Sequence, residues 1–482
     1  MSDDDPTHKL ICCQCVKETY LAHEIGQDGV EGKCSYCGSA QACIAVGTLA
    51  DRIDTAFNHH YSITSDQPHS WQQSLLSDRE SDYEWERDGY PVLDVIEAAA
   101  SIPREAAEDV LEILTDRYGD LDASLMGDQT EFSPDAHYEE KGASAQVWQE
   151  EWRDFERSIK TEARFFSRSA SDLLARVFGN IDSLTTKPRH QLVEDVGPNR
   201  KLANLYRARF FQSDENLEEA LCRPDLHLGS PPAQLASPGR MNAHGISVFY
   251  GATKSSVALT EVRPPVGSKV LVARFDITRP MRLLNLTALD SVSDGGSIFD
   301  PFFKGRLERI AFLRTLSQRM TSPVMPNDED SEYLVTQAIA DFLATENEPR
   351  LDGIIFNSAQ SRSGRNVVLF HHAASVEKIS FPEGTNITAH AGYDTEEGWE
   401  ADYRVSEAVP EASARKSLLN EFGQAGFFPD FGSADIENQD GRRAALRVVL
   451  DTVAVHEINW VKVHSSRFAV TRERYEKRDS KF

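Results

Sequence analysis

Four cysteines near the N-terminus have the spacing of a tetrahedral metal site. Cys12 and Cys15 form one C-x-x-C pair, and Cys34 and Cys37 form a second one. Two such pairs are typical of structural zinc sites, in which four thiolates fill the coordination sphere and leave no position for a reactive water. We therefore expect a zinc ion that supports folding and performs no hydrolysis. A reduced thiol cluster without metal is the alternative, and Cys13 could replace Cys12 as a ligand.

A second group of chemically capable residues lies in the stretch GRMNAHGISVFYGATKSSVALTEVRPP, residues 239–265. Its pattern predicts a loop that carries Arg240, a strand that ends at Tyr250, and a helix that Pro264 terminates. Glu261 falls on the inward face of this helix, three and four residues after two apolar positions. An inward carboxylate needs a partner, which is either a substrate or a neighbouring arginine that pairs with it for packing alone.

The order and spacing of these motifs resemble the RES domain family, toxins named for their arginine, glutamate and serine. The resemblance covers residues 200–372, with Met241 where the family usually has tryptophan. It includes YRAR at 206–209, GRMN with a following tyrosine at 239–250, AxxEV at 258–262, and DGIIFNS with GRNVVLF at 352–370. The resemblance implies catalytic roles for Arg240, Tyr250, Glu261 and Ser358, and substrate-binding roles for Arg207, Asn242 and Asn366.

The same resemblance implies a fold, a substrate and partners. RES domains look like ADP-ribosyltransferases, and members of the family degrade NAD, so NAD is the expected substrate. The N-terminal part is similar to the zinc-bearing, HEPN-like helical domain found ahead of some RES domains. The resemblance therefore implies a toxin of a toxin–antitoxin or phage-defence system, with an antitoxin or regulatory protein as a possible partner and a homodimer as a possible assembly.

The residue types fit cleavage of the bond between nicotinamide and ribose. This reaction builds positive charge on the ribose as a neutral ring leaves, so a carboxylate such as Glu261 would stabilise it. A guanidinium of Arg207 or Arg240 can bind the pyrophosphate with bidentate geometry. Tyr250 can stack on the nicotinamide ring, and Ser358 can hydrogen-bond the ribose or the carboxamide. There is no Gly-rich dinucleotide fingerprint, so we expect NAD to be consumed as substrate and expect no cofactor besides zinc.

Three alternatives stay open at this stage. ADP-ribose could be transferred to phosphate or to a protein, as a mono-ADP-ribosyltransferase does, instead of to water. The helical part could be a ribonuclease, because HEPN-like domains can carry an arginine–histidine motif and this chain has Arg52 and His59. The N-terminal part could also be a regulatory or partner-binding platform that holds the catalytic domain inactive.

The helices and strands expected to position these residues indicate a multidomain α+β protein. A chain of 482 residues exceeds the size of a single hydrophobic core, so several domains are expected. We place a four-cysteine zinc-binding module at 1–44, a helical HEPN-like domain at 45–190, a RES catalytic domain at 200–382, and an α+β C-terminal extension at 383–482.

Periodicity gives a coarse outline of the elements within these domains. Apolar spacing predicts one long helix over 145–178 and further helices near 303–321 and 331–345, whereas 65–88 is expected to be a long loop. In the C-terminal extension, 442–451 is expected to be helical and 458–463 to be strand-like.

The net charge argues against nucleic acid as a partner, and the distribution of apolar residues argues against a membrane. The formal net charge of −26 would repel a phosphate backbone over most of the surface, so a large nucleic-acid interface is not expected. The N-terminus has no basic region followed by an apolar run, and no stretch approaches the roughly 20 apolar residues of a membrane span. We therefore expect a cytoplasmic protein that does not bind membranes.

Overall fold

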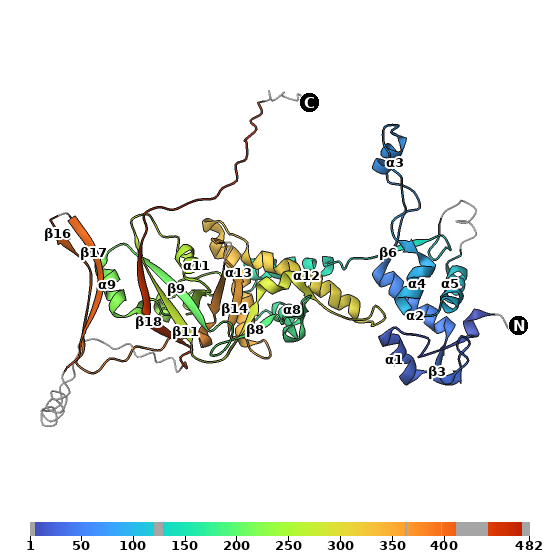
Figure 1. The fold of residues 1–482 in the computed structure, drawn as a ribbon, viewed down its shortest axis with the longest axis horizontal. Helices are drawn as coiled ribbons and strands as arrows, with labels where there is room; N and C mark the ends of the chain where they lie inside the picture. The colour runs from blue at the N-terminus through green and yellow to red at the C-terminus, as the bar shows by residue number, and fades with distance from the viewer. Residues whose placement is uncertain (1–4, 120–128, 362–363, 397, 411–441, 475–482) are drawn as a thin grey trace. The chain divides into compact units, whose positions relative to one another are not determined.

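The computed structural model describes residues 5–119, 129–361, 364–396, 398–410 and 442–474 (Figure 1). These residues divide into two compact units. The first unit takes residues 1–192 and 288–320, and the second takes residues 193–287 and 321–482. Residues 288–320 thus group with the N-terminal unit, although they lie inside the range 200–382 expected for the catalytic domain. The expected domain ranges themselves stay predictions.

The first unit begins with a small antiparallel sheet that positions the cysteines. Its strands have the order β1-β3-β2, with β1 at Leu10–Cys12, β2 at Val30–Lys33 and β3 at Ala40–Ala45. The 3₁₀ helix η1 (Pro6–His8) precedes this sheet, and α1 (Thr19–Asp28) connects β1 to β2. One C-x-x-C pair starts at the last residue of β1, and the other starts directly after β2. Because both strands pair with β3, the two cysteine pairs come together at one end of the sheet.

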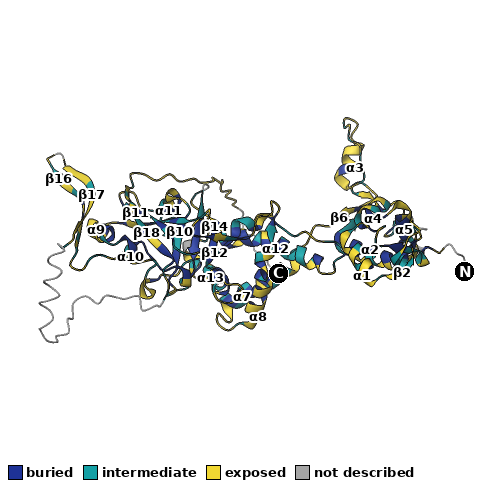
Figure 2. Cartoon of the chain, turned by 60° about the horizontal axis from the view of Figure 1, so that its bottom comes forward, coloured by how far each residue is buried: buried dark blue, intermediate teal, exposed yellow. Residues whose placement is uncertain are grey.

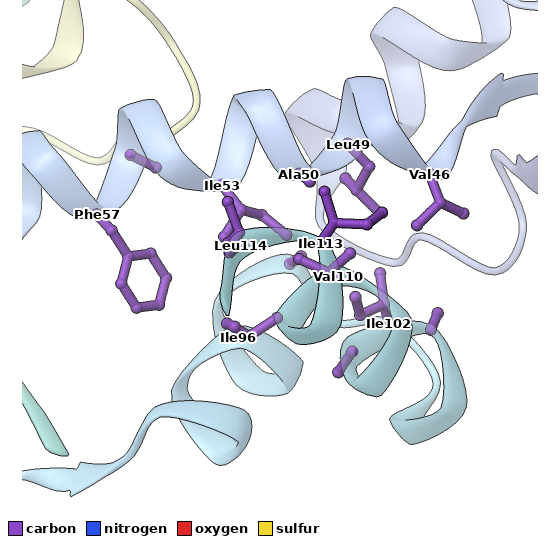
Figure 3. Packing of buried hydrophobic residues seen from close by; sticks show 14 of the residues in the cluster. Val46, Leu49, Ala50, Ile53, Phe57, Ile96, Ile102, Val110, Ile113 and Leu114 are labelled. Carbon is purple, nitrogen blue, oxygen red and sulfur yellow. The ribbon is translucent and has the colours of Figure 1, made fainter. Parts of the chain in front are cut away.

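A helical core follows the small sheet. It is formed by α2 (Val46–His60), α4 (Val92–Ala100) and α5 (Arg104–Tyr118). Figure 3 shows one face of α2 packed against the other helices, and the labelled residues of that face are Val46, Leu49, Ala50, Ile53 and Phe57. Their spacing of three, four and seven residues is that of one helix face, which explains why apolar periodicity identified this region as helical.

The segment expected to be a loop at 65–88 contains a helix, so this prediction was wrong in part. Helix α3 spans Ser70–Ser77. The backbone N–H of His69 donates to the Gln72 side chain at 2.7 Å, which closes one half of a capping box. This local cap outweighs the polar composition of the segment. The segment emerges from a three-stranded sheet with the order β4-β6-β5, whose strands are Tyr61–Ile63, His137–Glu140 and Tyr90–Pro91.

The long helix expected over 145–178 is two helices, so this prediction was wrong in its continuity. Helix α7 spans Gln146–Thr161 and α8 spans Arg168–Phe178. Phe166 between them has a φ of 60° and is fully exposed, and a helix cannot continue through that backbone conformation. The Ser167 hydroxyl then accepts from the backbone of Ala170 and starts the second helix.

Helix α12 (Phe303–Thr321) packs against α7 in the first unit. The ring of Trp152 on α7 lies 5.2 Å from that of Phe312 on α12, and Trp152 is almost fully buried. This contact places the tryptophan in the core of the unit. The remaining short elements of the unit are η2 (Ile181–Ser183), β7 (Thr185–Thr186) and β13 (Val292–Ser293), with η4 at Leu286–Ser291 leading into the last of them.

The second unit is built on a mixed eight-stranded sheet. The strand order is β18-β11-β9-β10-β15-β14-β12-β8, in which β12 and β14 are parallel and the other neighbours are antiparallel. In chain order the strands are β8 (Val193–Val196), β9 (Asn204–Phe211), β10 (Phe249–Ala252), β11 (Lys269–Ile277), β12 (Met281–Asn285), β14 (Gly353–Asn357), β15 (Arg365–Leu369) and β18 (Leu446–Glu457). Together with the first unit, this sheet confirms the predicted α+β class.

Helices and a hairpin surround this sheet. They are α9 (Asp214–Cys222), α10 (Pro224–His227), α11 (Ser255–Glu261), α13 (Glu329–Thr345) and the hairpin of β16 (Asn386–Thr395) with β17 (Gly398–Ala408), besides the 3₁₀ turns η3 (Ala233–Leu235), η5 (Pro326–Asp328) and η6 (His371–Ala373). Buried residues concentrate in the strands of the sheet, whereas the hairpin is largely exposed (Figure 2). Helix α11 packs on one face of the sheet, where Val257 and Ala258 meet Ala208, Ala252 and Val272.

The C-terminal secondary structure differs from the prediction. Residues 442–451, expected to be helical, lead into strand β18, and residues 458–463, expected to be strand-like, have no regular structure. Both predictions were wrong. Residues 446–451 are a strand because pairing with β11 along an open sheet edge outweighs their local propensity, whereas the pairing with β11 ends at Glu457 and leaves 458–463 without a partner strand in the described residues. In the described residues, no helix is both long and apolar enough to cross a membrane.

Candidate active site

Five of the seven residues predicted for the site line a single pocket of about 340 Å³ in the second unit. The pocket lies beside the sheet, where β9, β10, β14 and β15 meet α11 and the first turns of α13. The five residues are Arg207, Arg240, Tyr250, Glu261 and Asn366. The other two, Asn242 and Ser358, each hydrogen-bond to one of the five. The fold therefore brings together motifs that span more than 150 residues of sequence.

Glu261 is the last residue of α11 and is held by Ser358. The Ser358 hydroxyl donates to Oε1 of Glu261 at 2.5 Å. The hydroxyl oxygen of Ser358 in turn accepts from the backbone N–H groups of Gln360 and Ser361 at 3.1 and 2.9 Å. Because these two donors occupy its acceptor positions, the serine must direct its proton at Glu261. Ser358 thus fixes the orientation of the carboxylate.

The alternative in which Glu261 only pairs with an arginine has no support in the described residues. Neither Arg240 nor Arg263 lies within ion-pair distance of this carboxylate there. The predicted strand and helix around Glu261 are confirmed, although β10 runs two residues past Tyr250, to Ala252. The carboxylate is half-buried and faces the pocket, where it is available to a ligand.

Arg207 on β9 brings an unsatisfied positive charge to the pocket. Its guanidinium carbon lies 4.8 Å from the centre of the Phe249 ring, and its Nη1 is shielded from solvent without a hydrogen-bond partner in the described chain. Burial, together with the nearby charge of Arg209, lowers the pKa of Arg207 to about 10. A shielded donor without a partner costs free energy, about 1–3 kcal/mol or more for a charged group. An anionic ligand would relieve this cost.

Tyr250 presents its ring to the pocket while its hydroxyl is engaged in the loop behind it. The hydroxyl donates to Oδ1 of Asn242 at 2.8 Å and accepts from the backbone N–H of Met241 at 3.0 Å. Asn242 is buried, and its amide donates to the carbonyls of Ser237 and Ile246, both at 3.0 Å. We therefore propose that Asn242 supports Tyr250 and does not itself contact a substrate.

The loop that carries Arg240 is held by α13. Thr336 donates its hydroxyl to the Arg240 carbonyl, and the amide of Gln337 donates to the Gly239 carbonyl at 2.9 Å. The Arg240 guanidinium lies 5.1 Å from the ring centre of Tyr333 and donates to the Ser322 carbonyl at 2.8 Å. Helix α13 therefore positions both the backbone and the side chain of Arg240.

The cysteine sulfurs form a compact group in the first unit. The four ligand atoms of Cys12, Cys15, Cys34 and Cys37 all lie within 4.8 Å of one another. The Cys12–Cys37 and Cys15–Cys34 sulfur pairs are 3.6 and 3.8 Å apart. Tetrahedral zinc with Zn–S bonds of about 2.3 Å requires S–S separations of about 3.8 Å. The four cysteines can therefore bind a metal such as zinc.

Cys13 does not belong to this group. Its sulfur lies 4.0 Å from the side-chain oxygen of Gln41, which directs it away from the other four sulfurs. The buried Cys43 donates to the Gly32 carbonyl at 3.5 Å instead. The geometry thus favours Cys12 over Cys13 as the ligand.

Two family matches correspond to these two parts of the chain. Residues 205–389 match the RES domain family, and residues 27–172 match the HEPN/RES N-terminal domain 1 family. The chain carries a RES domain behind a HEPN/RES N-terminal domain. These matches confirm the resemblance stated from the motifs. Comparison with curated proteins and with solved structures gives no match.

The RES match encloses the whole candidate site. All seven residues predicted for the site lie between 205 and 389. A RES domain is ADP-ribosyltransferase-like, which suggests an NAD-related enzyme. Its combination with the HEPN/RES N-terminal domain fits a module of the toxin–antitoxin type.

The HEPN/RES N-terminal domain carries the two residues considered for a ribonuclease. Arg52 and His59 both lie on α2. The Arg52 guanidinium forms an ion pair with Glu24 of α1, so it is engaged inside the domain. No further observation favours RNA cleavage, and we do not propose it.

Sequence motifs alone did not identify the contribution of α13 to the RES domain site. Tyr333, Thr336 and Gln337 are about a hundred positions from the Arg240 loop that they contact. Their spacing of three and four residues on one helix face is the signal that was available, since it places an aromatic and two polar groups side by side. Nothing local indicated which loop they would meet.

We expect Tyr250→Phe to destabilise the RES domain at neutral pH by about 1–3 kcal/mol, because Asn242 loses its donor while it stays buried. Burial raises the pKa of Tyr250 to about 12, above the value of about 10 expected in the unfolded chain. The neutral hydroxyl therefore contributes stability that is complete below about pH 10 and is lost as the pH rises from about 10 to 12. Thermal unfolding of both proteins across this range should show a weaker pH dependence in the variant.

The exposed Tyr393 supplies the control for this comparison. Tyr393→Phe should melt like the wild type at neutral pH. If Tyr250→Phe also melts like the wild type, then the hydroxyl does not hold the loop, and the structural reason given for its position is wrong.

Proposed function

We propose that the RES domain cleaves the bond between nicotinamide and ribose in NAD and acts as the toxin of a toxin–antitoxin type module. One observation carries this proposal. A carboxylate, Glu261, is oriented by Ser358 on the wall of a pocket to which Arg207 brings an unpartnered guanidinium nitrogen. Such a pocket offers a carboxylate for a developing cation and a guanidinium for a phosphate.

The arrangement supports a simple course for the reaction. The nicotinamide ring stacks on Tyr250, and the phosphate next to the reacting ribose pairs with Arg207. The bond between the ring nitrogen and the ribose breaks, and its electron pair neutralises the pyridinium. The ribose carbon then carries positive charge, which the carboxylate of Glu261 stabilises until an oxygen nucleophile attacks. Ser358 keeps the carboxylate oriented throughout, since two backbone donors fix the serine in turn.

The pocket is compatible with the nicotinamide half of the dinucleotide. Its volume of about 340 Å³ lies at the lower end of the range of about 300–1,000 Å³ that is usual for ligand sites. Asn366 on β15 also lines it and is buried, so its amide is placed to read the carboxamide or a ribose hydroxyl. We propose this binding role for Asn366.

The proposal is tested by incubating the purified full-length chain with NAD and separating the products by chromatography. Release of nicotinamide with ADP-ribose as the other product indicates hydrolysis. A product that forms only with added phosphate indicates phosphorolysis, and a labelled protein indicates ADP-ribosyl transfer. If the chain releases no nicotinamide in vitro and leaves NAD levels unchanged when expressed in cells, the proposal is wrong.

For the first unit, we propose zinc as the resident metal and a structural role for it. Four thiolates suit zinc, and a site with four protein ligands has no open position for a substrate or water. Cys12, Cys15, Cys34 and Cys37 would hold the ion, and it would join the ends of β1 and β2. RES domains are associated in general with antitoxin partners. An antitoxin or a second copy of this chain as the partner stays a prediction.

A further inference from the structure

Arg263 occupies a backbone position that normally belongs to glycine. Helix α11 ends at Glu261, Val262 is its C-cap, and Arg263 follows with a φ of 46°. A left-handed residue directly after the C-cap is a common way to end a helix, and glycine is the usual choice because it has no Cβ to clash. An arginine there is sterically unfavourable, and such residues are concentrated at binding sites.

The guanidinium of Arg263 lies at the rim of the RES domain pocket. Arg263 lines the pocket and is exposed, whereas Glu261 two residues earlier is half-buried on its wall. With the Gln360 amide oxygen turned toward it, Nε and Nη2 of Arg263 donate to that oxygen at 3.2 and 3.1 Å. A neutral amide holds the side chain in place without neutralising its charge.

The charge of Arg263 is not matched by a carboxylate. Elsewhere in this unit arginines pair with acidic residues, as in Arg223–Asp225, Arg279–Asp352 and Arg365–Glu194. In the part of the chain that the structure describes, neither Arg207 nor Arg263 forms such a pair. Arg207 and Arg263 thus bring positive charge to the pocket in addition to Arg240, although the whole chain carries a net charge of −26. A surface so acidic would repel an anionic substrate unless positive charge at the entrance of the pocket attracts it.

We propose that Arg263 binds the outer phosphate of a pyrophosphate, so that the site selects a dinucleotide over a nucleoside or a mononucleotide of nicotinamide. This inference rests on the proposed function. The reacting ribose must lie beside Glu261, and the pyrophosphate leads from that ribose toward the second nucleoside. Arg207 within the pocket meets the phosphate nearest the ribose, and Arg263 at the rim meets the next one. A substrate that lacks the second phosphate leaves Arg263 without a ligand.

The test measures how two variants cleave NAD and how they cleave nicotinamide riboside, which has no phosphate. Asparagine tolerates the left-handed conformation, so Arg263→Asn removes the charge and keeps the helix end. We expect KM for NAD to rise about 10-fold with kcat unchanged. The variant loses one charge-assisted hydrogen bond that stabilises the bound substrate and the transition state equally. Cleavage of nicotinamide riboside should not change. Arg404→Asn, at an exposed arginine on β17, should behave like the wild type with both substrates.

A third variant separates binding from a structural role. Arg263→Gly removes the steric cost of the left-handed backbone and should leave the melting temperature unchanged or raise it. KM for NAD should rise as in Arg263→Asn. A residue that only ended the helix would show no effect on KM in either variant. Equal KM values for NAD in the wild type and Arg263→Asn overturn the inference and leave the proposed function standing.

Binding of ADP-ribose, measured by calorimetry, tests the inference even if NAD is not cleaved. ADP-ribose contains the pyrophosphate but not the reacting bond. We expect the wild type to bind it about 10-fold more tightly than Arg263→Asn. Equal affinity, or no binding to either protein, contradicts the role of Arg263. Failure to cleave NAD with a retained affinity difference contradicts only the proposed function.

Discussion

Glu261→Gln should lower the rate of NAD cleavage by about 10²–10³-fold, with KM nearly unchanged. The side-chain amide keeps the shape of the carboxylate and still accepts the hydrogen bond from Ser358. It removes the negative charge that would stabilise the cationic ribose in the transition state. Because that charge matters little to bound NAD before the bond breaks, the loss should fall on kcat. The measurement is the initial rate of nicotinamide release over a range of NAD concentrations, at matched protein levels.

Glu407→Gln provides a matched control, since Glu407 is an exposed glutamate on β17 of the same unit. Its rate and melting temperature should equal those of the wild type. The cleavage rate of Ser358→Ala should lie between those of Glu261→Gln and Glu407→Gln, because the carboxylate stays charged but loses the donor that orients it. If Glu261→Gln cleaves NAD as fast as the control, then this carboxylate does not stabilise the transition state, and the assignment of the site has to be abandoned.

The central residues of the candidate site could be predicted from the sequence because several of them lie close together along the chain. Arg240, Tyr250 and Glu261 lie in one loop–strand–helix segment, and the geometry of that segment follows from its turns and periodicity. The support of the site was not predictable in the same way. The packing of Tyr333 against Arg240 joins segments far apart in sequence, and no local pattern specifies such a contact. Asn242 shows the related difficulty that a motif position does not reveal which way its side chain points.

The fold shows the same division between local and non-local information. Helix α2 could be predicted because its apolar residues recur at helical spacing and pack on one face. Strand β18 could not, because its structure depends on the open edge of β11, which lies far away in the chain. The break between α7 and α8 was missed for another reason. Apolar residues keep nearly helical spacing up to Phe166, but that residue is in solvent and has a left-handed backbone.

Loss of a single cysteine ligand should have the largest effect on the first unit. We expect Cys34→Ser to reduce the zinc content of the purified full-length chain from about one ion to almost none. Zinc binding in small structural sites contributes about 10–16 kcal/mol of apparent free energy, so the small sheet β1-β3-β2 should open without the ion. Cys34 is buried, and its sulfur lies 3.8 Å from that of Cys15, so its loss leaves three of the four thiolates at the site. Metal analysis by mass spectrometry gives the zinc content, and limited proteolysis detects the opened segment.

Cys13→Ser is the sharpest control because Cys13 is adjacent to a ligand and yet lies outside the group of four sulfurs. It should keep a full zinc content and the protease resistance of the wild type, whereas Cys12→Ser should lose both. If Cys13→Ser loses zinc and Cys12→Ser retains it, then the adjacent cysteine is the ligand and the geometry has been misread. If the wild-type chain carries well under one zinc per molecule, the thiols form a reduced cluster. The packing of Ile11, Val16, Leu21 and Ile25 onto the helical core then has to hold the sheet without metal.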